Sequence, residues 1–548
     1  MEFPGFIGET YQSRSLIADA EQCVNLYPEQ IESGAGKNSI VLYPTPGLSQ
    51  LGYDPPDGVY VNVPDFILAM KTVWNVSQVE NQTWIVTCSQ QSGTVARTLG
   101  LYLALNLGLY AQATLPSSSV PPNNVLMASS GTQLLIAADN NLYCYNLITG
   151  ANLLPVTSWN TIAAGGGFGF KITGLDFLDG FFLITTQSAL YASAAGDGTS
   201  WNSINYINIS DEPDGIVGLL CDHRLAWIFS LTRTESYYNA GGVDFPFQRV
   251  PQGVMETGCF YASSIVAADE SVFWLGCGKQ GGPTVYRKNG YTPVRVSNHA
   301  IERLLQQYVQ LGDYGGSTRA AWLGLRAYAY REGGHLFYVL NFGGVNPAAT
   351  AVYGYSPFPT QPTTLVFDAT TNLWHERQYS SDGVNFSRHL GNFYAFEPSI
   401  GHLVSDYRSS VIYAMSSAYL TDAGALMTRW RTAPHLATEN KLNFYSQFVL
   451  DCEVGTEGLP TPTAAQGLAP APEVRSATQT LTLQWSDDGG QTWGQPKPLT
   501  VGQGGNYKAR AIWRRLGKSR DRVFKVSTSD AMQVAFINAY IEMTQGNS

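Results

Sequence analysis

Short apolar runs separated by clusters of glycine, asparagine, aspartate and serine make up most of the chain. The segment TQLLIAADNNLYCYNLITGA, from Thr132 to Ala151, is typical, with Asp139-Asn140-Asn141 between two apolar runs and a second turn from Asn146 to Gly150. Asparagine and aspartate tolerate the left-handed backbone that tight hairpin turns require. The pattern therefore predicts two antiparallel strands of a small sheet.

Similar units recur along the sequence. Residues 174–202, 263–296 and 335–379 each contain three or more such runs. Their irregular spacing, roughly 40 to 50 residues, fits divergent propeller blades better than a sandwich of evenly spaced strands. We predict a mostly β protein: a β-propeller core of antiparallel blades with inserted loops, and an additional C-terminal β segment.

One segment has a clear helical pattern. In SNHAIERLLQQYVQ, which begins at Ser297, the apolar residues Ile301, Leu304, Leu305 and Tyr308 share one face, and Ser297 or Asn298 can cap the helix. The segment after Ser317 has alternating aromatic residues and is compatible with either a helix or a strand. A single helix near residues 297–309 is therefore expected within the β-rich core.

The composition shifts suggest four parts. Residues 1–125 are expected to form an N-terminal β segment with inserted loops, as part of the propeller or attached to it. Residues 126–454 are expected to hold the blades. Residues 455–477 are rich in proline, alanine and glycine and predict a linker or long surface loop. Residues 478–548 read as C-terminal β-hairpins.

The composition limits the function classes. The chain is 44% hydrophobic and 12% aromatic, which excludes a disordered protein, and only 14% of its residues are charged. A soluble domain usually has about 25% charged residues, so we expect other protein to cover much of this surface. The net charge of −10 disfavours nucleic-acid binding over the whole surface and leaves only a local basic face.

The sequence has no clear targeting, metal or catalytic motif. No run approaches 18 apolar residues and the first twenty residues lack the order of a signal peptide, so we expect no membrane span and synthesis in the cytoplasm. The seven cysteines lie far apart, which predicts buried free thiols. The seven histidines have no metal-ligand spacing and are expected at the surface or in loops. We therefore predict no cofactor, no metal site and no catalytic residues.

The tightest local motif is an Asp-box, formed by Ser486, Asp488, Gly490, Thr492 and Trp493. Its aspartate can accept backbone N–H bonds inside the turn, its glycine takes the positive φ, and its tryptophan packs back on the hairpin, so the motif is a folding device. Degenerate copies occur at residues 197–201 and 381–386. Asp-boxes also occur in sialidase-like glycosidases, but such an enzyme needs paired carboxylates or an arginine cluster with a tyrosine, and the sequence alone brings no chosen pair together.

One basic run interrupts the acidic background. A hairpin with its turn near residues 517–520 would place Arg510 and Arg514 on one face, because side chains alternate along a strand. A solvated hairpin tip and a protein contact explain this run equally well, and DNA phosphates explain it less well. The candidate contact face comprises Arg510, Arg514, Arg515, Lys518, Arg520 and Arg522.

Several segments, in the same order and at similar spacing, resemble the tail hub proteins of short-tailed bacteriophages, a family named for stabilising packaged DNA. The resemblance spans most of the chain, with apparent insertions at residues 54–125, 340–365 and 455–477. The segments are ADAEQCVNLYPE (18–29), PTPGL (44–48), EPDGIVGLLCDHRLAWIFSLTRTESYYNAGG (212–242), residues 253–258, VSNHAIERLLQQY (296–308), and the hairpins LQWSDDGGQTWGQP and IWRRLGKSRDRVFKVSTSD.

The resemblance implies a structural, non-enzymatic virion protein of the tail. Such hubs look like rings of six propeller-bearing subunits below the portal and its adaptor ring, which close the DNA exit channel and anchor tail spikes or fibres and a needle or plug. Double-stranded DNA would pass through the ring without sequence-specific binding. An Asp-box glycosidase and a carbohydrate-binding tail module are the alternatives.

Overall fold

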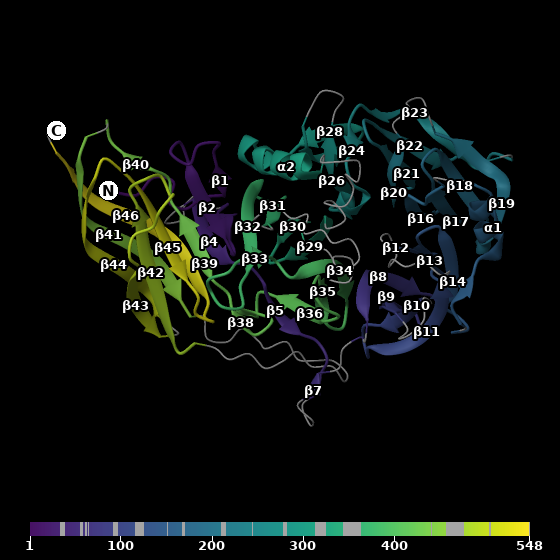
Figure 1. Ribbon diagram of the computed structural model, residues 1–548, viewed down its shortest axis with the longest axis horizontal. Coiled ribbons are helices and arrows are strands. Elements are labelled where there is room, and N and C mark those ends of the chain that lie inside the picture. Colours follow the sequence, from purple (N-terminus) through teal and green to yellow (C-terminus); the bar gives the residue numbers. More distant parts are fainter. Residues whose placement is uncertain are drawn as a thin grey trace.

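The computed structural model shows a propeller and a sandwich side by side, with both chain termini at the sandwich end (Figure 1). No helix in the described part of the chain is long and apolar enough to cross a membrane. The described residues are 1–32, 39–54, 59–60, 63, 65–90, 97–115, 125–150, 152–166, 170–209, 215–243, 245–277, 282–312, 325–343, 363–439, 441–455, 476–503 and 506–546.

Seven antiparallel blades can be traced through the described residues. The first four follow one another along the chain. They consist of β8 (Phe66–Asn75), β9 (Glu80–Gln90), β10 (Arg97–Leu103) and β11 (Gly108–Leu115); β12 (Val125–Ser129), β13 (Gln133–Ala138), β14 (Asn141–Asn146) and β15 (Leu154–Pro155); β16 (Gly174–Leu178), β17 (Phe181–Thr185), β18 (Ala189–Ala194) and β19 (Asp197–Asn208); and β20 (Ile216–Asp222), β21 (Leu225–Ser230), β22 (Thr234–Asn239) and β23 (Phe247–Met255).

The last three blades are less regular, because the inner strand of blade 5 is split and blade 7 takes a strand from the N-terminus. Blade 5 contains the short 3-10 helix η1 (Ala262–Ser264) between its two inner pieces. The strands are β24 (Gly258–Cys259), β25 (Val266–Ala268), β26 (Ser271–Cys277), β27 (Thr284–Asn289) and β28 (Thr292–Arg295); β29 (Arg326–Glu332), β30 (His335–Phe342), β31 (Thr363–Asp368) and β32 (Leu373–Tyr379); and β34 (Gly391–Glu397), β35 (Gly401–Asp406), β36 (Ile412–Ser416) and β5 (Gly47–Gln50).

The blades close into a ring. The innermost strands β8, β12, β16 and β20 contact one another in turn, β20 contacts η1, β25 contacts β29, β29 contacts β34, and β34 returns to β8. Strand β5 completes blade 7 by pairing antiparallel with β36, so that Leu48 lies opposite Met415. The propeller is therefore closed by a strand that precedes blade 1 in the sequence.

The hairpin turns follow the sequence pattern. In blade 2, Asp139 has a φ of 53° between β13 and β14, and Ala138 pairs with Asn141 across the turn. This left-handed conformation is one that aspartate and asparagine adopt more readily than other side chains. The two strands predicted from residues 132–151 are present as β13 and β14.

The C-terminal sandwich consists of two sheets. The first continues directly from blade 6, because β2 (Ala20–Val24) pairs parallel with β32 through Val24 and Glu376 and antiparallel with β39 (Arg429–Thr432). It then runs through β45 (Asp521–Thr528), β42 (Thr478–Ser486) and β43 (Lys497–Gln503). The second sheet has the order β3 (Leu26–Gln30), β4 (Ile40–Pro44), β46 (Val534–Gln545), β41 (Asn443–Val454) and β44 (Asn506–Ser519).

The sandwich core combines both ends of the chain. Phe3, Phe6 and Leu26 pack with Phe448 and Phe524, and the rings of Phe6 and Phe448 lie 5.5 Å apart in an edge contact. The remaining strands are short pieces around this core and blade 7: β1 (Tyr11–Gln12), β6 (Tyr53–Asp54), β7 (Val59–Tyr60), β33 (Ser387–Arg388), β37 (Thr421–Asp422), β38 (Ala425–Leu426) and β40 (Leu436–Ala437).

One boundary differs from the four parts expected from the sequence. Residues 66–115 form blade 1, which the expectation for residues 1–125 allowed, but strands β39, β40 and β41 belong to the sandwich although they precede residue 455. Composition could not reveal this, because strands of the propeller and of the sandwich have the same alternating pattern. Most of the linker predicted at residues 455–477 lies outside the described residues.

The structure contains the predicted helix and one that the sequence pattern did not indicate. The first is α2 (His299–Gly312), in which Asn298 accepts the backbone N–H of Ile301 at 2.9 Å. The second is α1 (Thr157–Gly165), which buries only Trp159. Its polar residues give a weak apolar stripe, which explains why the pattern did not reveal it. The ambiguous segment after Ser317 includes strand β29, and its first part lies outside the described residues.

Candidate interaction surfaces

Buried arginines at the junction of propeller and sandwich bind the N-terminal segment. The side chain of Arg431, fully buried on β39, donates hydrogen bonds to the carbonyl oxygens of Phe6 (2.6 Å), Glu9 (2.7 Å) and Gly5 (2.9 Å) and pairs with Glu21. Arg377 on β32 donates to the carbonyl oxygen of Pro46 at 2.5 Å. The N-terminal segment is thus held by charge-assisted bonds on both sides of the junction.

The burial of these arginines is not evident from the sequence. The only local signal is the alternation in Arg429-Trp430-Arg431-Thr432, where charged residues on a strand suggest a solvent-facing side. In the structure all four residues are buried. The N-terminal segment covers Arg431, whereas Arg429 donates hydrogen bonds to the carbonyl oxygens of Leu420 and Asp530. Contacts between residues some 400 positions apart leave no local pattern.

A buried carboxyl group lies at the same junction. Glu376, opposite Val24 where β2 meets β32, is 5% exposed, and burial raises the pKa of its side chain to about 7. The pKa of Glu376 is higher in the folded protein than in the unfolded chain, where it is near 4.5, so the protonated side chain favours the folded state. This stabilisation is complete below the unfolded pKa and is lost as the pH rises through about 7. Above neutral pH the folded protein must therefore hold a desolvated carboxylate.

We expect Glu376→Gln to stabilise the protein in a pH-dependent way. Glutamine has nearly the same shape and no charge to desolvate, so the free energy of unfolding should change little at pH 5 and rise by roughly 2–3 kcal/mol at pH 8. Urea midpoints at the two pH values measure the effect. The control is Glu439→Gln at an exposed position. Equal effects of Glu376→Gln at pH 5 and pH 8 would show that the carboxyl group is not desolvated.

Three of the seven histidines expected at the surface or in loops are buried, although His389 does lie in a loop. His335, His375 and His389 have 5% exposure or less. His335 Nδ1 lies 2.7 Å from Asp368 Oδ2, which raises the pKa of His335, whereas burial lowers the pKa of His375 to about 3. Local sequence does not reveal this burial, because the groups that cover these side chains come from distant parts of the chain: the ring of Tyr27 packs against both His335 and His375.

The Asp-box forms the turn between β42 and β43. The Asp488 carboxylate accepts hydrogen bonds from the Ser486 hydroxyl (2.6 Å), the Thr492 hydroxyl (2.5 Å) and the Thr492 N–H (2.9 Å), which lower its pKa to about 2. Gly490 has a φ of +89°. Trp493 is only half-buried, with the Lys525 ammonium 5.5 Å from its ring. Both carboxylate oxygens are engaged within the turn.

The degenerate copies have the same local bonding. Asp197 accepts the N–H of Thr199 at 2.9 Å, and the Trp201 indole donates to the carbonyl oxygen of Gly198 at 2.7 Å. Asp382 accepts the N–H groups of Val384 and Asn385. The aspartate side chains of these turns therefore hold the backbone of the turn in place by accepting its N–H groups.

The candidate basic face is split by the structure. Arg510, Arg514, Arg515, Lys518 and Arg520 have exposed side chains on β44 and the following turn. Arg510 pairs with Asp451 at 3.0 Å, and Arg514 donates to Gln447 at 3.2 Å.

Arg522 does not belong to this face. Its side chain is 2% exposed and bonds both oxygens of Asp487, at 2.6 and 2.9 Å. Alternation on β45 turns Arg522 toward the Asp-box turn, where it lies over the rings of Tyr445 and Trp485. This interstrand pairing was not visible from the local sequence.

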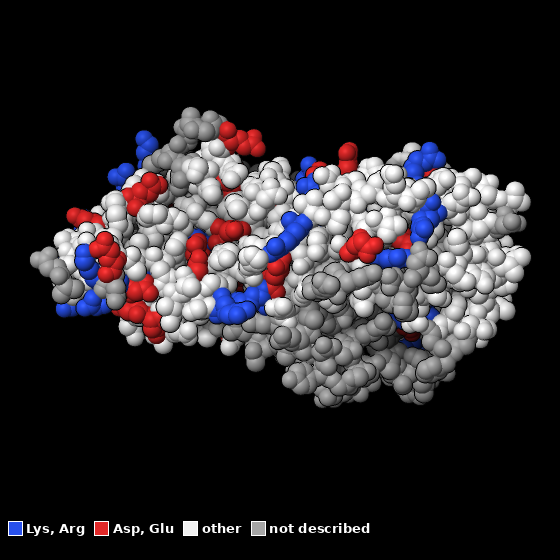
Figure 2. All heavy atoms as spheres, turned by 90° about the horizontal axis from the view of Figure 1, so that it is seen from above, with Lys and Arg blue, Asp and Glu red and all other residues white. Residues whose placement is uncertain are grey.

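The outer strands of blades 1–3 are nearly free of charge. The 73 residues from Thr98 to Phe170 contain a single charged residue, Asp139. Figure 2 shows the right-hand end of the molecule, where α1, β18 and β19 lie in Figure 1, as white almost throughout, with charged side chains toward the middle and the sandwich. We call the exposed apolar residues of this region the apolar rim: Leu109, Tyr110, Ile148, Leu154, Ile204 and Tyr206.

The apolar rim coincides with open sheet edges. Strands β11 and β19 are the outermost strands of blades 1 and 3, and β11 carries neither charge nor proline. An exposed, uncharged edge strand is an aggregation hazard that soluble proteins usually blunt with charges. Large exposed apolar patches mark contact sites for other molecules.

The described side chains include no cluster typical of metal or disulfide chemistry. All seven cysteines are free, six are buried, and burial raises the pKa of thiols such as Cys23 and Cys259 to about 12. Within the described residues, no three His, Cys, Asp or Glu side chains gather as metal ligands.

The architecture and surfaces define a class, a β-propeller fused to a C-terminal β-sandwich. Two family models match it: "Bacteriophage P22 Gp10, beta-propeller" at residues 66–321 and "Bacteriophage P22 Gp10, beta-sandwich" at residues 428–544. The chain belongs to the bacteriophage P22 Gp10 family, a structural and generally non-enzymatic family of virion proteins. The predicted fold class and family resemblance are confirmed. Because the first match starts at residue 66, most of the segment 54–125 is blade 1 rather than an insertion.

Solved structures show only a distant likeness. The N-terminal domain of Nup159 is 9% identical, with a TM-score of 0.37, over 72% of this chain and 99% of that one. The WD40 domain of Neurospora crassa Pan2 is also 9% identical, with a TM-score of 0.37, over 68% of this chain and 95% of that one. A comparison with curated proteins gave no match.

Proposed function

We propose that this chain is the tail hub, or nozzle, subunit of a short-tailed phage. Six copies would form a ring below the portal and its adaptor, close and line the DNA exit channel, and anchor tail fibres or spikes and a needle or plug. The protein would be made in the host cytoplasm and act in the virion tail. Membership of the P22 Gp10 family supports this role.

The apolar rim is the observation that carries the proposal. Six exposed apolar side chains lie on three successive blades, four of them within the 73-residue stretch from Thr98 to Phe170 that has a single charged residue. Such a surface is costly to leave in water. Burial against a neighbouring subunit removes this cost and covers the open edges of β11 and β19. A ring subunit has such a neighbour at all times.

The continuous sheet suits a subunit under mechanical load. Hydrogen-bonded strands run from blade 6 through β2 into the sandwich, and the buried Arg431 bonds the N-terminal segment to the sandwich strand β39. Two domains joined in this way are expected to move as one body, unlike domains joined by a flexible linker.

The charge balance suits passage of DNA better than its retention. A net charge of −10 repels phosphate and disfavours tight, sequence-independent binding. The exposed arginines of β44 are local and partly paired, as Arg510 is with Asp451. We infer that the duplex passes between subunits without sequence-specific contacts.

Electron microscopy and native mass spectrometry of the purified protein, alone and with portal and adaptor, test this role. We expect rings of six copies with a central hole. A protein that stays monomeric in every mixture would overturn the proposal. Hydrolysis of sialylated or capsular sugars would favour the glycosidase alternative, for which the Asp-box has no spare carboxylate oxygen, and glycan binding by the monomer would favour a carbohydrate-binding module.

We expect Ile204→Lys to weaken ring assembly. Ile204, on β19, is 78% exposed in the single chain, and a lysine there would place a charge in an apolar contact, which should weaken self-association roughly ten-fold or more. Sedimentation velocity across a concentration series measures the change. Val384→Lys, at a position 76% exposed and outside the apolar rim, is the matched control. Identical association of the two variants would place the contact elsewhere.

A further inference from the structure

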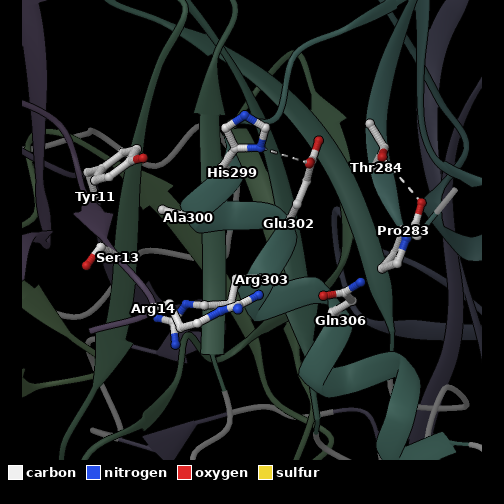
Figure 3. Close-up of a pocket in the computed structure, with 11 residues that line it drawn as sticks. Tyr11, Ser13, Arg14, Pro283, Thr284, His299, Ala300, Glu302, Arg303 and Gln306 are labelled. Atoms are coloured by element: carbon white, nitrogen blue, oxygen red, sulfur yellow. Dashed lines mark hydrogen bonds and ion pairs between the residues drawn. The ribbon is translucent and has the colours of Figure 1, made fainter. Parts of the chain in front are cut away.

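A concave pocket lies between β1, β27 and α2, where the N-terminal segment crosses blade 5. Its volume is about 410 Å³, enough for several side chains. Figure 3 shows Arg14, from the loop after β1, beside Arg303 from α2, with His299 and Glu302 nearer the start of the helix and Gln306 further along it. Residues 299, 303 and 306 share one face of the helix, which gives α2 one wall of the pocket.

Arg14 and Arg303 form a cationic pair that has no carboxylate partner within the described part of the chain. Arg303 Nη2 donates a long hydrogen bond of 3.3 Å to the carbonyl oxygen of Gln12, and its buried Nε has no acceptor. Among the described residues, no carboxylate oxygen lies within 4 Å of Arg14 or Arg303. Burial, together with the nearby Arg14 charge, lowers the pKa of Arg303. A buried N–H donor without an acceptor is costly, and an anion would relieve it.

The acidic residue of the pocket is already engaged. Glu302 accepts two hydrogen bonds from Arg295, at 2.6 and 2.8 Å, and one from the Ser297 hydroxyl at 2.9 Å. These bonds engage its carboxylate with Arg295 and Ser297, so it does not neutralise the arginine pair. The pocket therefore has a cationic side, formed by Arg14 and Arg303, and a neutralised side.

We propose that this pocket binds the carboxylate of an acidic peptide segment of a partner protein, with Arg14 and Arg303 as its cationic ligands and Gln306 as a neutral donor. Arginine matches carboxylate geometry through paired N–H groups. The apolar wall of Pro283 and Ala300 suits the stem of an acidic side chain. A DNA backbone is less suitable, because duplex binding requires a broad basic surface rather than two arginines in a concavity of an acidic protein.

Fluorescence anisotropy of the full-length chain with a fluorescein-labelled hexaglutamate peptide tests the proposal. We expect saturable, salt-sensitive binding, weakened roughly ten-fold or more in Arg303→Gln and in Arg14→Gln. Arg303→Lys should bind with intermediate affinity, because it keeps the charge and loses the paired donors. The labelled hexaglutamine peptide should not bind.

Arg224→Gln is the matched control, because it removes one arginine whose side chain is 83% exposed, in the turn between β20 and β21 and outside every candidate contact surface. Its affinity should equal that of the unchanged protein, and melting temperatures identify any variant that fails to fold. The proposal is overturned by absence of binding, by equal loss in Arg224→Gln, or by tighter, arginine-dependent binding of a short DNA duplex or inorganic phosphate. Peptide binding in this pocket does not depend on ring assembly, so the pocket proposal and the ring proposal can fail independently.

Discussion

Replacement of Arg431 by methionine is expected to lower the free energy of unfolding by about 3–5 kcal/mol. This is the usual cost of removing one partner of a buried ion pair. Methionine keeps most of the side-chain volume but removes every donor. The carbonyl oxygens of Gly5, Phe6 and Glu9 and the Glu21 carboxylate would then lose a shared partner inside the protein. Urea unfolding followed by tryptophan fluorescence and by limited proteolysis of the N-terminal segment measures the loss.

Arg224→Met is the control for this change. Arg224 also pairs with a carboxylate, that of Asp179 at 3.2 Å, but its side chain is 83% exposed. Exposed ion pairs contribute about 0–1 kcal/mol, so the control should unfold almost as the unchanged protein does. Similar midpoints for the two variants would mean that Arg431 does not hold the N-terminal segment.

Replacement of Leu48 by alanine is expected to cost about 3 kcal/mol and to loosen blade 7 selectively. Leu48 is fully buried on β5, opposite Met415, in a cluster that includes Tyr328 and Tyr413. A cavity here weakens the strand that closes the propeller ring. Hydrogen exchange should speed up in β36 and β34 before it does in the sandwich.

Leu154→Ala is the control that tests whether the burial of Leu48 causes the loss of stability in Leu48→Ala. Leu154 is 58% exposed on β15, and loss of an exposed side chain should change stability by no more than about 0.5 kcal/mol. If hydrogen exchange in Leu48→Ala rises evenly over the whole chain, then β5 is part of a single cooperative unit rather than a local closure.

The family match covers the propeller and the sandwich separately, and residues 1–65 and 322–427 fall between or before the two matched ranges. Those unmatched ranges contain β2 and β5, which join the two folds, and also Glu376 and the described part of blade 6. Changes that uncouple propeller from sandwich are therefore expected to map mainly to these segments, and the Arg431 and Leu48 variants examine the two sides of that junction.

The sequence by itself determined the secondary-structure class, the hairpin turns and the family. Alternation, turn residues such as Asp139 and the Asp-box around Asp488 act over a few neighbouring residues, and such patterns are readable without a partner strand. Charge depletion between Thr98 and Phe170 is likewise visible directly.

Only the tertiary structure decided how these pieces are combined. It showed that the N-terminal strand β5 closes the propeller, that Arg431 and Arg522 are buried, and that Arg14 and Arg303 share a pocket. Each depends on contacts between residues far apart in the sequence, and a strand's alternation does not indicate which sheet it joins. Whether a charged residue faces water or a carbonyl oxygen is decided by the second layer that covers it.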